Sequence, residues 1–331
     1  MRNSINFPLC SIITVNYNSK PYLKNCLDSL EKQTYPNCEI IVVDNASTDN
    51  SIEIVKKYPK IKLIENKINL GFAGGMNTGI RKAKGKYVAM IDSDTIADRN
   101  WISELIKVMK SNKSIGIVGG KIYLLTPKGE KTNSLRYVGG KLHKFFNFYL
   151  LGSKIGQNKE DTGLYENLIE VDFIHGCGFL VRNDIFNGIG LMDEEYFMYG
   201  EEIDWCYRVR DVGYKIFYVP SAIIWHVGSP GVGKVSYKKT YYVQRSNIRL
   251  ILKLFELHWI IWYVFFSGIL HMFLKLSYAM IKGVFTDDLR AIYDAVKWNI
   301  KNIKKTLEVR KEWKIRKMKI LKNKELFYVH A

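Results

Sequence analysis

The chain has 331 residues, enough for one large α/β domain with an appendage or for two modest domains. Hydrophobic residues make up 47% of the sequence and charged residues 25%, a balance typical of a globular protein that excludes a disordered one. Lysine and arginine number 50 against 32 acidic residues, so the net charge is +18. Such a field attracts polyanions: nucleic acid, anionic lipid or diphosphate substrates. Only the motifs can distinguish between these.

The five cysteines are scattered along the chain, and no two of them have CxxC spacing. This pattern argues against a disulfide framework and against a zinc site, and it favours a reducing compartment. The apolar stretch 9–15 is short and runs directly into Asn16, so no signal peptide is expected. The catalytic part is therefore expected in the cytosol.

Apolar β-type runs alternate with helical patterns between residues 11 and 124, which predicts a mostly parallel sheet flanked by helices. Asp49 is expected to cap the second helix, and Asn100 or Asp98 the fourth. The expected strands are 11–15, 40–44, 61–64, 87–92 and 115–118, and the expected helices lie near 20–33, 49–57, 73–84 and 99–111.

The rest of the chain divides into three stretches. The polar, glycine-rich stretch 126–140 is expected to form a hairpin or loop, and strand and helix patterns return over 171–227. From about 237, long helical runs rich in lysine, arginine and large aromatics replace the alternation. We therefore predict a domain boundary near 236, with a helical tail over 237–331.

Polar side chains lie where three of the predicted strands end. Tyr17 follows the first strand, Asp44 and Asn45 end the second, and Asp92 and Asp94 end the fourth. Each of them alone is typical of a helix cap or a turn, but the carboxyl ends of parallel strands meet at one sheet edge, where ligands bind. Two carboxylates one residue apart can share Mg²⁺ or Mn²⁺ together with substrate phosphates. The alternative for this aspartate pair is a solvated turn.

A glycine-rich run over 69–79, which includes Gly71 and Asn77, opens a predicted helix. Glycines let the backbone approach a ligand, and helix N-terminal N–H groups favour phosphate, although a plain helix-entry loop remains an alternative. The run 228–234 has the spacing of a phosphate-binding loop, but Val235 replaces the required Ser or Thr. We therefore exclude a phosphate-binding loop there.

An acidic segment made of Glu201, Glu202 and Asp204 begins a helical run in the second half of the chain. Adjacent carboxylates can position and deprotonate an acceptor hydroxyl. The alternative is an acidic first helical turn favoured by the helix dipole. His226 ends the strand-like run 222–226, in a chain already expected to hold a metal.

Residues from about 10 to 250 resemble glycosyltransferase family 2, which has the GT-A fold, and are most similar to the rhamnosyltransferase-like branch that builds surface polysaccharides. In the matching order, Trp225 and His226 follow the acidic segment at a spacing that resembles the family's. The other matching segments are 11–18, 42–45, 69–79, 92–94 and 176–182.

The resemblance implies a role for each matching residue. Glu202 would be the general base, with Glu201 as the alternative because the family usually has Asp at the second position of the pair. Arg245 would lie near the donor diphosphate, although Ser246 replaces the more usual Asn. The donor would contact Tyr17, Asp44 (at the pyrimidine edge), Asn45, Gly71, Asn77 and Asp92, and the metal would bind Asp92, Asp94 and His226.

The function implied is inverting transfer of a sugar from dTDP-rhamnose or a UDP-sugar to a hydroxyl of a lipid-linked or polysaccharide acceptor. Residues 1–236 would form the catalytic domain, with a nucleotide-binding half over about 1–124 and an acceptor half over 125–236. A sugar-nucleotidyltransferase would need a glycine-rich, basic loop after the first strand, which residues 16–20 do not supply. A non-enzymatic membrane or nucleic-acid binder would leave the acidic motifs without a role, so no nucleic-acid partner is expected.

The tail combines an apolar segment with a basic one. Residues 257–274 carry no formal charge, are at the lower edge of the length needed to span a bilayer, and contain aromatics typical of a membrane interface. Residues 297–324 are strongly basic, which suits anionic lipid. We expect peripheral binding at the cytoplasmic face of the membrane, with a helical homodimer or a true span as alternatives.

Overall fold

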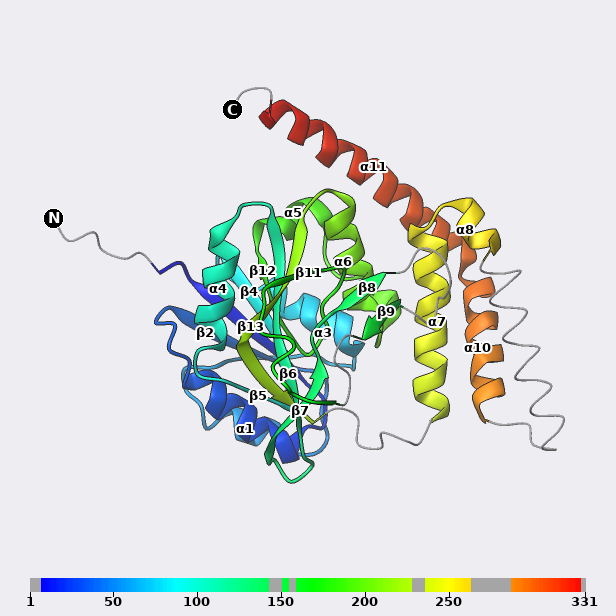
Figure 1. The fold of residues 1–331 in the computed structure, drawn as a ribbon. Helices are drawn as coiled ribbons and strands as arrows, with labels where there is room; N and C mark the ends of the chain where they lie inside the picture. Colours follow the sequence, from blue (N-terminus) through cyan, green and yellow to red (C-terminus); the bar gives the residue numbers. More distant parts are fainter. Residues whose placement is uncertain (1–6, 143–150, 155–158, 228–235, 263–286, 329–331) are drawn as a thin grey trace.

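The computed structural model describes residues 7–142, 151–154, 159–227, 236–262 and 287–328. A central sheet with helices on both faces forms the body of the molecule, and further helices lie beside it (Figure 1). Four strands of the first half pair in parallel in the order β3-β2-β1-β4. They are β1 (Cys10–Asn16), β2 (Cys38–Asp44), β3 (Lys62–Glu65) and β4 (Tyr87–Asp92).

The second half of the chain extends this sheet with mixed strand directions. The strand β12 lies antiparallel between β4 and β6, and β7 and β10 continue the sheet beyond β6. The strand β13 runs parallel to β6 and also pairs with β5 and β11, while β8 and β9 form a separate hairpin. The bounds are β5 (Thr95–Ala97), β6 (Ile115–Leu125), β7 (Lys131–Tyr137), β8 (Gly140–Leu142), β9 (Leu151–Lys154), β10 (Lys159–Glu160), β11 (Ile169–Val171), β12 (Gly178–Arg182) and β13 (Lys215–His226).

Strand periodicity decides which helices cover which face of the sheet. Successive strand side chains point to opposite faces, so Ile13 packs with helices α3, α5 and α6 while Ile12 packs with α1 and α4. Both faces are therefore apolar, as expected for strands buried between two helical layers. The bounds are α1 (Lys20–Glu31), α2 (Ile52–Val55), α3 (Gly71–Ile80), α4 (Trp101–Ser111), α5 (Asp184–Ile189), the 3₁₀ helix η2 (Glu194–Tyr196) and α6 (Glu201–Asp211).

The mixed α/β architecture expected from the sequence is confirmed, with corrections at helix ends. Helix α2 is only one turn long, and Ser51 is its N-cap; the Asp49 carboxylate instead accepts hydrogen bonds from the backbone N–H groups of Ser51 and Lys20. Asn100 is the N-cap of α4, but its side chain makes no capping bond. Asn100 thus takes the expected N-cap position without a capping hydrogen bond, whereas the carboxylates of Asp49 and Asp98 accept hydrogen bonds from backbone N–H groups two residues ahead in local Asx turns.

In the described part of the tail, four helices follow the sheet: α7 (Tyr237–Leu254), α8 (Leu257–Trp262), α10 (Asp287–Lys301) and α11 (Ile303–Tyr328). Helices α7 and α10 lie side by side, and α11 crosses to α5 (Figure 1). The Asp211 carboxylate at the end of α6 accepts hydrogen bonds from Trp313 Nε1 and Lys317 Nζ. The change in composition near residue 236 therefore marks a change of element type, while the tail packs directly on the α/β body.

Across the described ranges, we find no helix that is both long and apolar enough to cross a membrane. The expected apolar segment 257–274 lies outside the described residues beyond Trp262.

A buried charge cluster joins α7 to the α/β body. Arg249 is fully buried and binds Asp193 at 2.9 Å, and Lys253 Nζ lies 2.8 Å from an oxygen of Asp193 and 2.7 Å from one of Asp204. Burial opposes ionisation of Asp193, but Lys253 and Arg249 hold its pKa below the ordinary value. Removing one partner of such a cluster leaves an uncompensated buried charge.

We expect Lys253→Met to lower the free energy of unfolding by about 3 kcal/mol at pH 7, because Asp193 and Asp204 lose a shared cation. Chemical denaturation measures this, with the exposed Lys301→Met as the matched control. The lowered pKa of Asp193 makes its stabilisation complete above the unfolded value of about 4 and lost as the pH falls further, so the difference between variants should shrink in acid. Equal stabilities at pH 7 would contradict a structural role for the cluster.

Candidate active site

A cleft of about 610 Å³ lies at the carboxyl edge of the parallel strands. The strand register brings this edge together: Asn16 at the end of β1 lies opposite Asp44 of β2, and Val15 lies opposite Asp92 of β4. The N-terminal part of α6 and two residues of α7, Lys239 and Val243, line the same cleft. Both halves of the chain and the tail therefore contribute to one cavity.

Asp92, Asp94 and His226 form a cluster that could hold a metal ion, with one ligand atom of each within 4.8 Å of the others. His226 Nε2 lies 3.2 Å from Asp94 Oδ1 and 3.5 Å from Asp92 Oδ2. The histidine reaches the aspartates because β13 pairs with β5, which places His226 opposite Thr95. Two carboxylates and one imidazole suit Mn²⁺ or Mg²⁺ with substrate oxygens completing the shell. The residues present therefore fit the divalent cation expected from the sequence.

The electrostatics of this cluster show that it favours a cation. Burial raises the pKa of Asp92 to about 7, against the lowering effect of His226, and the nearby charges of Asp94 and Glu202 raise it further. Burial also opposes ionisation of Asp94, but His226 and Arg136 hold its pKa below the ordinary value. The pKa of His226 is raised because Cys177 and Asp94 outweigh the effect of burial. A bound divalent cation would supply the positive charge that these carboxylates need.

Glu201 and Glu202 lie at the start of α6 and face the same cleft. The Gly200 N–H donates a hydrogen bond of 3.1 Å to Glu202 Oε2. Glu201 Oε2 is buried and accepts no hydrogen bond from the described residues. Burial, together with the negative charge of Glu202, raises the pKa of Glu201 well above its ordinary value. The two glutamates therefore differ in how their carboxylates are stabilised. The surroundings of Glu201 favour its protonated form, whereas the carboxylate of Glu202 accepts a hydrogen bond from the backbone.

The glycine-rich run begins α3 two residues earlier than expected, at Gly71, where φ is +72°. A Cβ at Gly71 would lie 2.2 Å from the carbonyl oxygen of Phe197, which accepts a hydrogen bond from the Phe72 N–H. Only glycine allows this approach and this φ. On the other side, Asn45 Nδ2 donates to the Gly71 carbonyl at 2.8 Å. The run therefore connects the first half of the chain to the segment that leads into Glu201.

The structure brings most of the predicted site residues together. The side chains or backbones of Tyr17, Asn45, Gly71, Asp92, Asp94, Glu201, Glu202 and His226 all line the cleft. Tyr17 is 46% exposed, so its ring is available to a ligand.

Three other predicted residues have structural partners and are not among the residues that line the cleft. Asp44 is 1% exposed and accepts hydrogen bonds from Asn16 Nδ2 and the Ser47 N–H. Asn77 exchanges two hydrogen bonds with the backbone of Met192. Asp204 lies in the buried charge cluster and also binds Arg208, so the structure assigns it to folding and not to the acid–base pair.

Arg245 is likewise absent from the cleft lining. Its Nη2 donates to the backbone carbonyls of Glu195 and Tyr196. Its guanidinium also lies 4.8 Å from the ring centre of Tyr242 and 4.5 Å from that of Trp298. These contacts join α7, α10 and η2, while the buried Nε has no hydrogen-bond partner among the described residues. The role near the donor diphosphate stays a prediction.

Sequence reasoning missed several residues that line the cleft. Arg136 near the end of β7 has a buried Nε without a hydrogen-bond partner among the described residues. Tyr137 and His175 stack with ring centres 3.9 Å apart, and Lys239 approaches from α7. The signal in the sequence that could have indicated them is the adjacent pair Arg136 and Tyr137, near the end of the stretch 126–140 that was expected to form a hairpin or loop. The pairing of β7 with β6 places this pair at the cleft.

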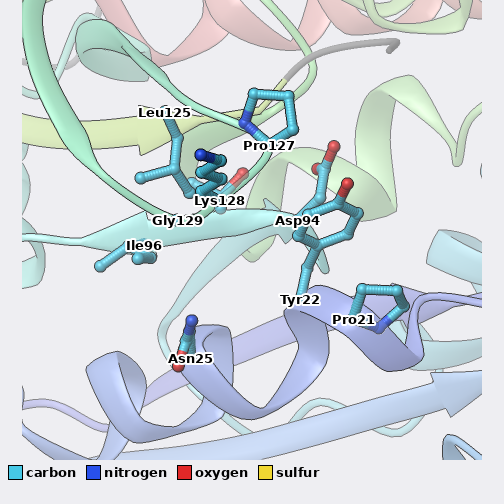
Figure 2. Close-up of a pocket in the computed structure, with 10 residues that line it drawn as sticks. Pro21, Tyr22, Asn25, Asp94, Ile96, Leu125, Pro127, Lys128 and Gly129 are labelled. Carbon is cyan, nitrogen blue, oxygen red and sulfur yellow. The ribbon is translucent and has the colours of Figure 1, made fainter.

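A second, much smaller pocket lies on another side of Asp94 (Figure 2). Tyr22 and Asn25 of α1 line one wall, and the hairpin turn residues Pro127, Lys128 and Gly129 line the other. Its volume of about 40 Å³ has room for water but not for a sugar. Of these two cavities, the larger cleft alone has room for a sugar nucleotide.

We expect Asp94→Asn to weaken Mn²⁺ binding at least tenfold, because one of the three clustered ligands loses its charge. Titration calorimetry of the nucleotide-free protein measures this. The control is Asp287→Asn, an exposed aspartate at the start of α10. Unchanged Mn²⁺ affinity in the Asp94 variant would contradict a metal site at this cluster.

Comparison with known proteins agrees with this geometry. The family model described as "Glycosyl transferase family 2" matches residues 11–190. An uncharacterized glycosyltransferase of Haemophilus influenzae is 29% identical over 66% of this chain, and the match spans 65% of that protein, just under two thirds of its length.

Two solved structures are similar in fold. The first is the mannosyltransferase PcManGT of Pyrobaculum calidifontis in complex with GDP-Man and Mn²⁺. The two structures superpose with a TM-score of 0.56 at 16% sequence identity, and the match covers 96% of this chain and 88% of the mannosyltransferase. The second is GalNAc-T7 with UDP, GalNAc and Mn²⁺. Here the TM-score is 0.57 at 17% sequence identity, and the match covers 76% of this chain and 48% of GalNAc-T7. At these identities the structures bear on the fold, which is the GT-A fold.

Proposed function

The chain belongs to glycosyltransferase family 2, and from this we propose that it is a divalent-cation-dependent, inverting enzyme that transfers a sugar from a nucleoside diphosphate to an acceptor hydroxyl. One observation carries the proposal: the Asp92, Asp94 and His226 cluster and the Glu201–Glu202 pair line the same cleft. A metal cluster can hold the diphosphate of a donor, and a carboxylate across the cleft can take the proton of an acceptor.

The residues of this chain divide the work between donor and acceptor. Mn²⁺ or Mg²⁺ at Asp92, Asp94 and His226 would neutralise charge on the leaving diphosphate. Glu202 accepts the proton of the acceptor hydroxyl as that oxygen attacks the anomeric carbon from the face opposite the diphosphate. A single displacement of this kind inverts the configuration. Glu201 is the less suited to accept this proton because burial and the charge of Glu202 raise its pKa and so disfavour its carboxylate form.

For the donor we propose dTDP-rhamnose or a UDP-sugar. The exposed ring of Tyr17 at the end of β1 offers a surface for the base, and Asn45 and Gly71 line the cleft beside it. The similar solved structures contain GDP-Man or UDP together with Mn²⁺, which supports a nucleotide-linked donor. For the acceptor we propose a lipid-linked or polysaccharide hydroxyl in the synthesis of cell-surface glycans.

We expect Glu202→Gln to retain donor binding and to lose at least two orders of magnitude in transfer rate, because the amide cannot accept the acceptor proton. Calorimetry with the donor and product-formation assays separate the two effects. The matched variant is Glu201→Gln, which leaves Glu202 in place and should retain more activity. If Glu201→Gln is inactive while Glu202→Gln turns over normally, the base is Glu201.

We further propose that the tail binds peripherally to an anionic membrane at the cytoplasmic face. Helix α10 exposes Tyr293, Val296 and Ile300, which recur at the helical spacing of one face. Exposed lysines, among them Lys297 and Lys301, lie beside them on the same helix. An apolar surface combined with basic charge provides the two interactions that stable peripheral binding needs.

We expect the full-length protein to float with vesicles that contain anionic lipid, and to do so less in high salt, because screening weakens the lysine contribution. The double variant Val296→Glu/Ile300→Glu should float several-fold less. The control Leu164→Glu/Leu168→Glu makes the same change at exposed leucines of the α/β body. A salt-insensitive dimer that ignores vesicles would support the homodimer alternative instead.

A further inference from the structure

Two cationic side chains line the cleft and form no ion pair with its acidic residues among the described residues. The described residues that line the cleft include one arginine, Arg136, and one lysine, Lys239. Lys239 is exposed on α7. Arg136 is only partly exposed, and no ion pair or hydrogen bond of its side chain is present among the described residues. Its guanidinium instead lies 5.9 Å from the ring centre of Tyr137.

The Arg136 Nε is the more informative atom because it is buried without an acceptor. A buried donor that lacks a partner destabilises the folded state. Such a group is retained where a ligand completes its hydrogen bonds. The planar guanidinium fork matches the oxygens of a carboxylate or phosphate, so the missing partner is an anion with paired oxygens.

Two observations place that anion at the metal end of the cleft. Arg136 and Asp94 line the same cleft. Asp94 belongs to the cluster expected to hold the cation and, with it, the donor diphosphate. Arg245, the residue expected to reach the diphosphate, also has a buried Nε without a partner among the described residues, but its Nη2 binds the carbonyls of Glu195 and Tyr196 and it is not among the residues that line the cleft. Arg136 is therefore the arginine that remains available at this position in the described cleft.

We infer that Arg136 binds the donor diphosphate and stabilises it as it leaves, in the place that sequence resemblance gave to Arg245. This inference rests on the proposed function. As the bond between the anomeric carbon and the diphosphate oxygen breaks, its electron pair goes to that oxygen, and Arg136 donates N–H groups to the oxygens of the departing group. The acceptor oxygen forms the new bond to the anomeric carbon, and its proton goes to Glu202. Arg136 itself neither gains nor loses a proton.

The experiment is a calorimetric titration of inorganic pyrophosphate into protein saturated with Mn²⁺, a probe that does not depend on which nucleotide the enzyme uses. We expect Arg136→Gln to weaken pyrophosphate binding at least tenfold and Arg136→Lys to weaken it less, because lysine keeps the charge but not the fork. Arg99→Gln, at an exposed arginine outside the cleft lining, is the control for the loss of one positive charge and should bind like the wild type.

Thermal unfolding of the ligand-free variants gives a second readout that a structural role would not produce. Because Arg136→Gln removes a buried donor without a partner, its Tm should stay equal to that of the wild type or rise. Arg245→Gln should instead lower Tm, since it removes hydrogen bonds between α7 and η2. A Tm loss of several degrees in Arg136→Gln would assign it to folding and overturn the inference.

The binding results separate this inference from the proposed function. If wild-type protein with Mn²⁺ binds pyrophosphate and Arg136→Gln binds it equally well, Arg136 does not contact the diphosphate and the inference alone is wrong. The same unchanged affinity is expected if Arg136 instead binds a phosphate group of the acceptor, and in that case too the inference is wrong. If wild-type protein binds neither pyrophosphate nor UDP, GDP or dTDP with Mn²⁺, the proposed function fails and this inference fails with it.

Discussion

Four carboxylates, from Asp92, Asp94, Glu201 and Glu202, line a single cleft, and their mutual repulsion is the constraint on which the site depends. The repulsion appears in the raised pKa of Asp92 and of Glu201, on top of the effect of burial. Such a group of acids is stable in a fold only when cations balance it. At this cleft His226 and Arg136 supply part of that balance, and the donor set fits a divalent cation that would supply the rest.

A second balance of charge holds the Glu201–Glu202 side of the cleft in place. Asp193 and Asp204 flank the segment that carries Glu201 and Glu202, and both bind cations from α7. The same segment touches the nucleotide-binding half where the Phe197 carbonyl meets Gly71. The acidic pair is therefore fixed from two sides, by the helical tail and by the glycine-rich helix. This explains why a tail of different composition packs tightly on the α/β body.

Within these constraints, sequence reasoning located the cleft well but assigned its polar residues unevenly. Asp92, Asp94 and His226 were placed correctly because each ends or follows a strand, and strand ends are visible as the limit of an apolar run. Asp44 has the same signal, yet its carboxylate is turned toward Asn16 and Ser47. The position of a residue along a strand predicts the sheet edge it reaches, but not which neighbour its side chain will bind.

The sequence by itself determined most strands and helices of the first half of the chain, the sheet edge at which the cleft lies and several of the polar residues that line it. It did so because periodicity, strand ends and short motifs are local properties of the chain. Only the tertiary structure decided which arginine faces the cleft. Arg245 is held by Glu195, Tyr196 and Trp298 on other elements, and Arg136 reaches the site through the pairing of β7 with β6. Those partners lie far from each arginine along the chain, so no local pattern could reveal them.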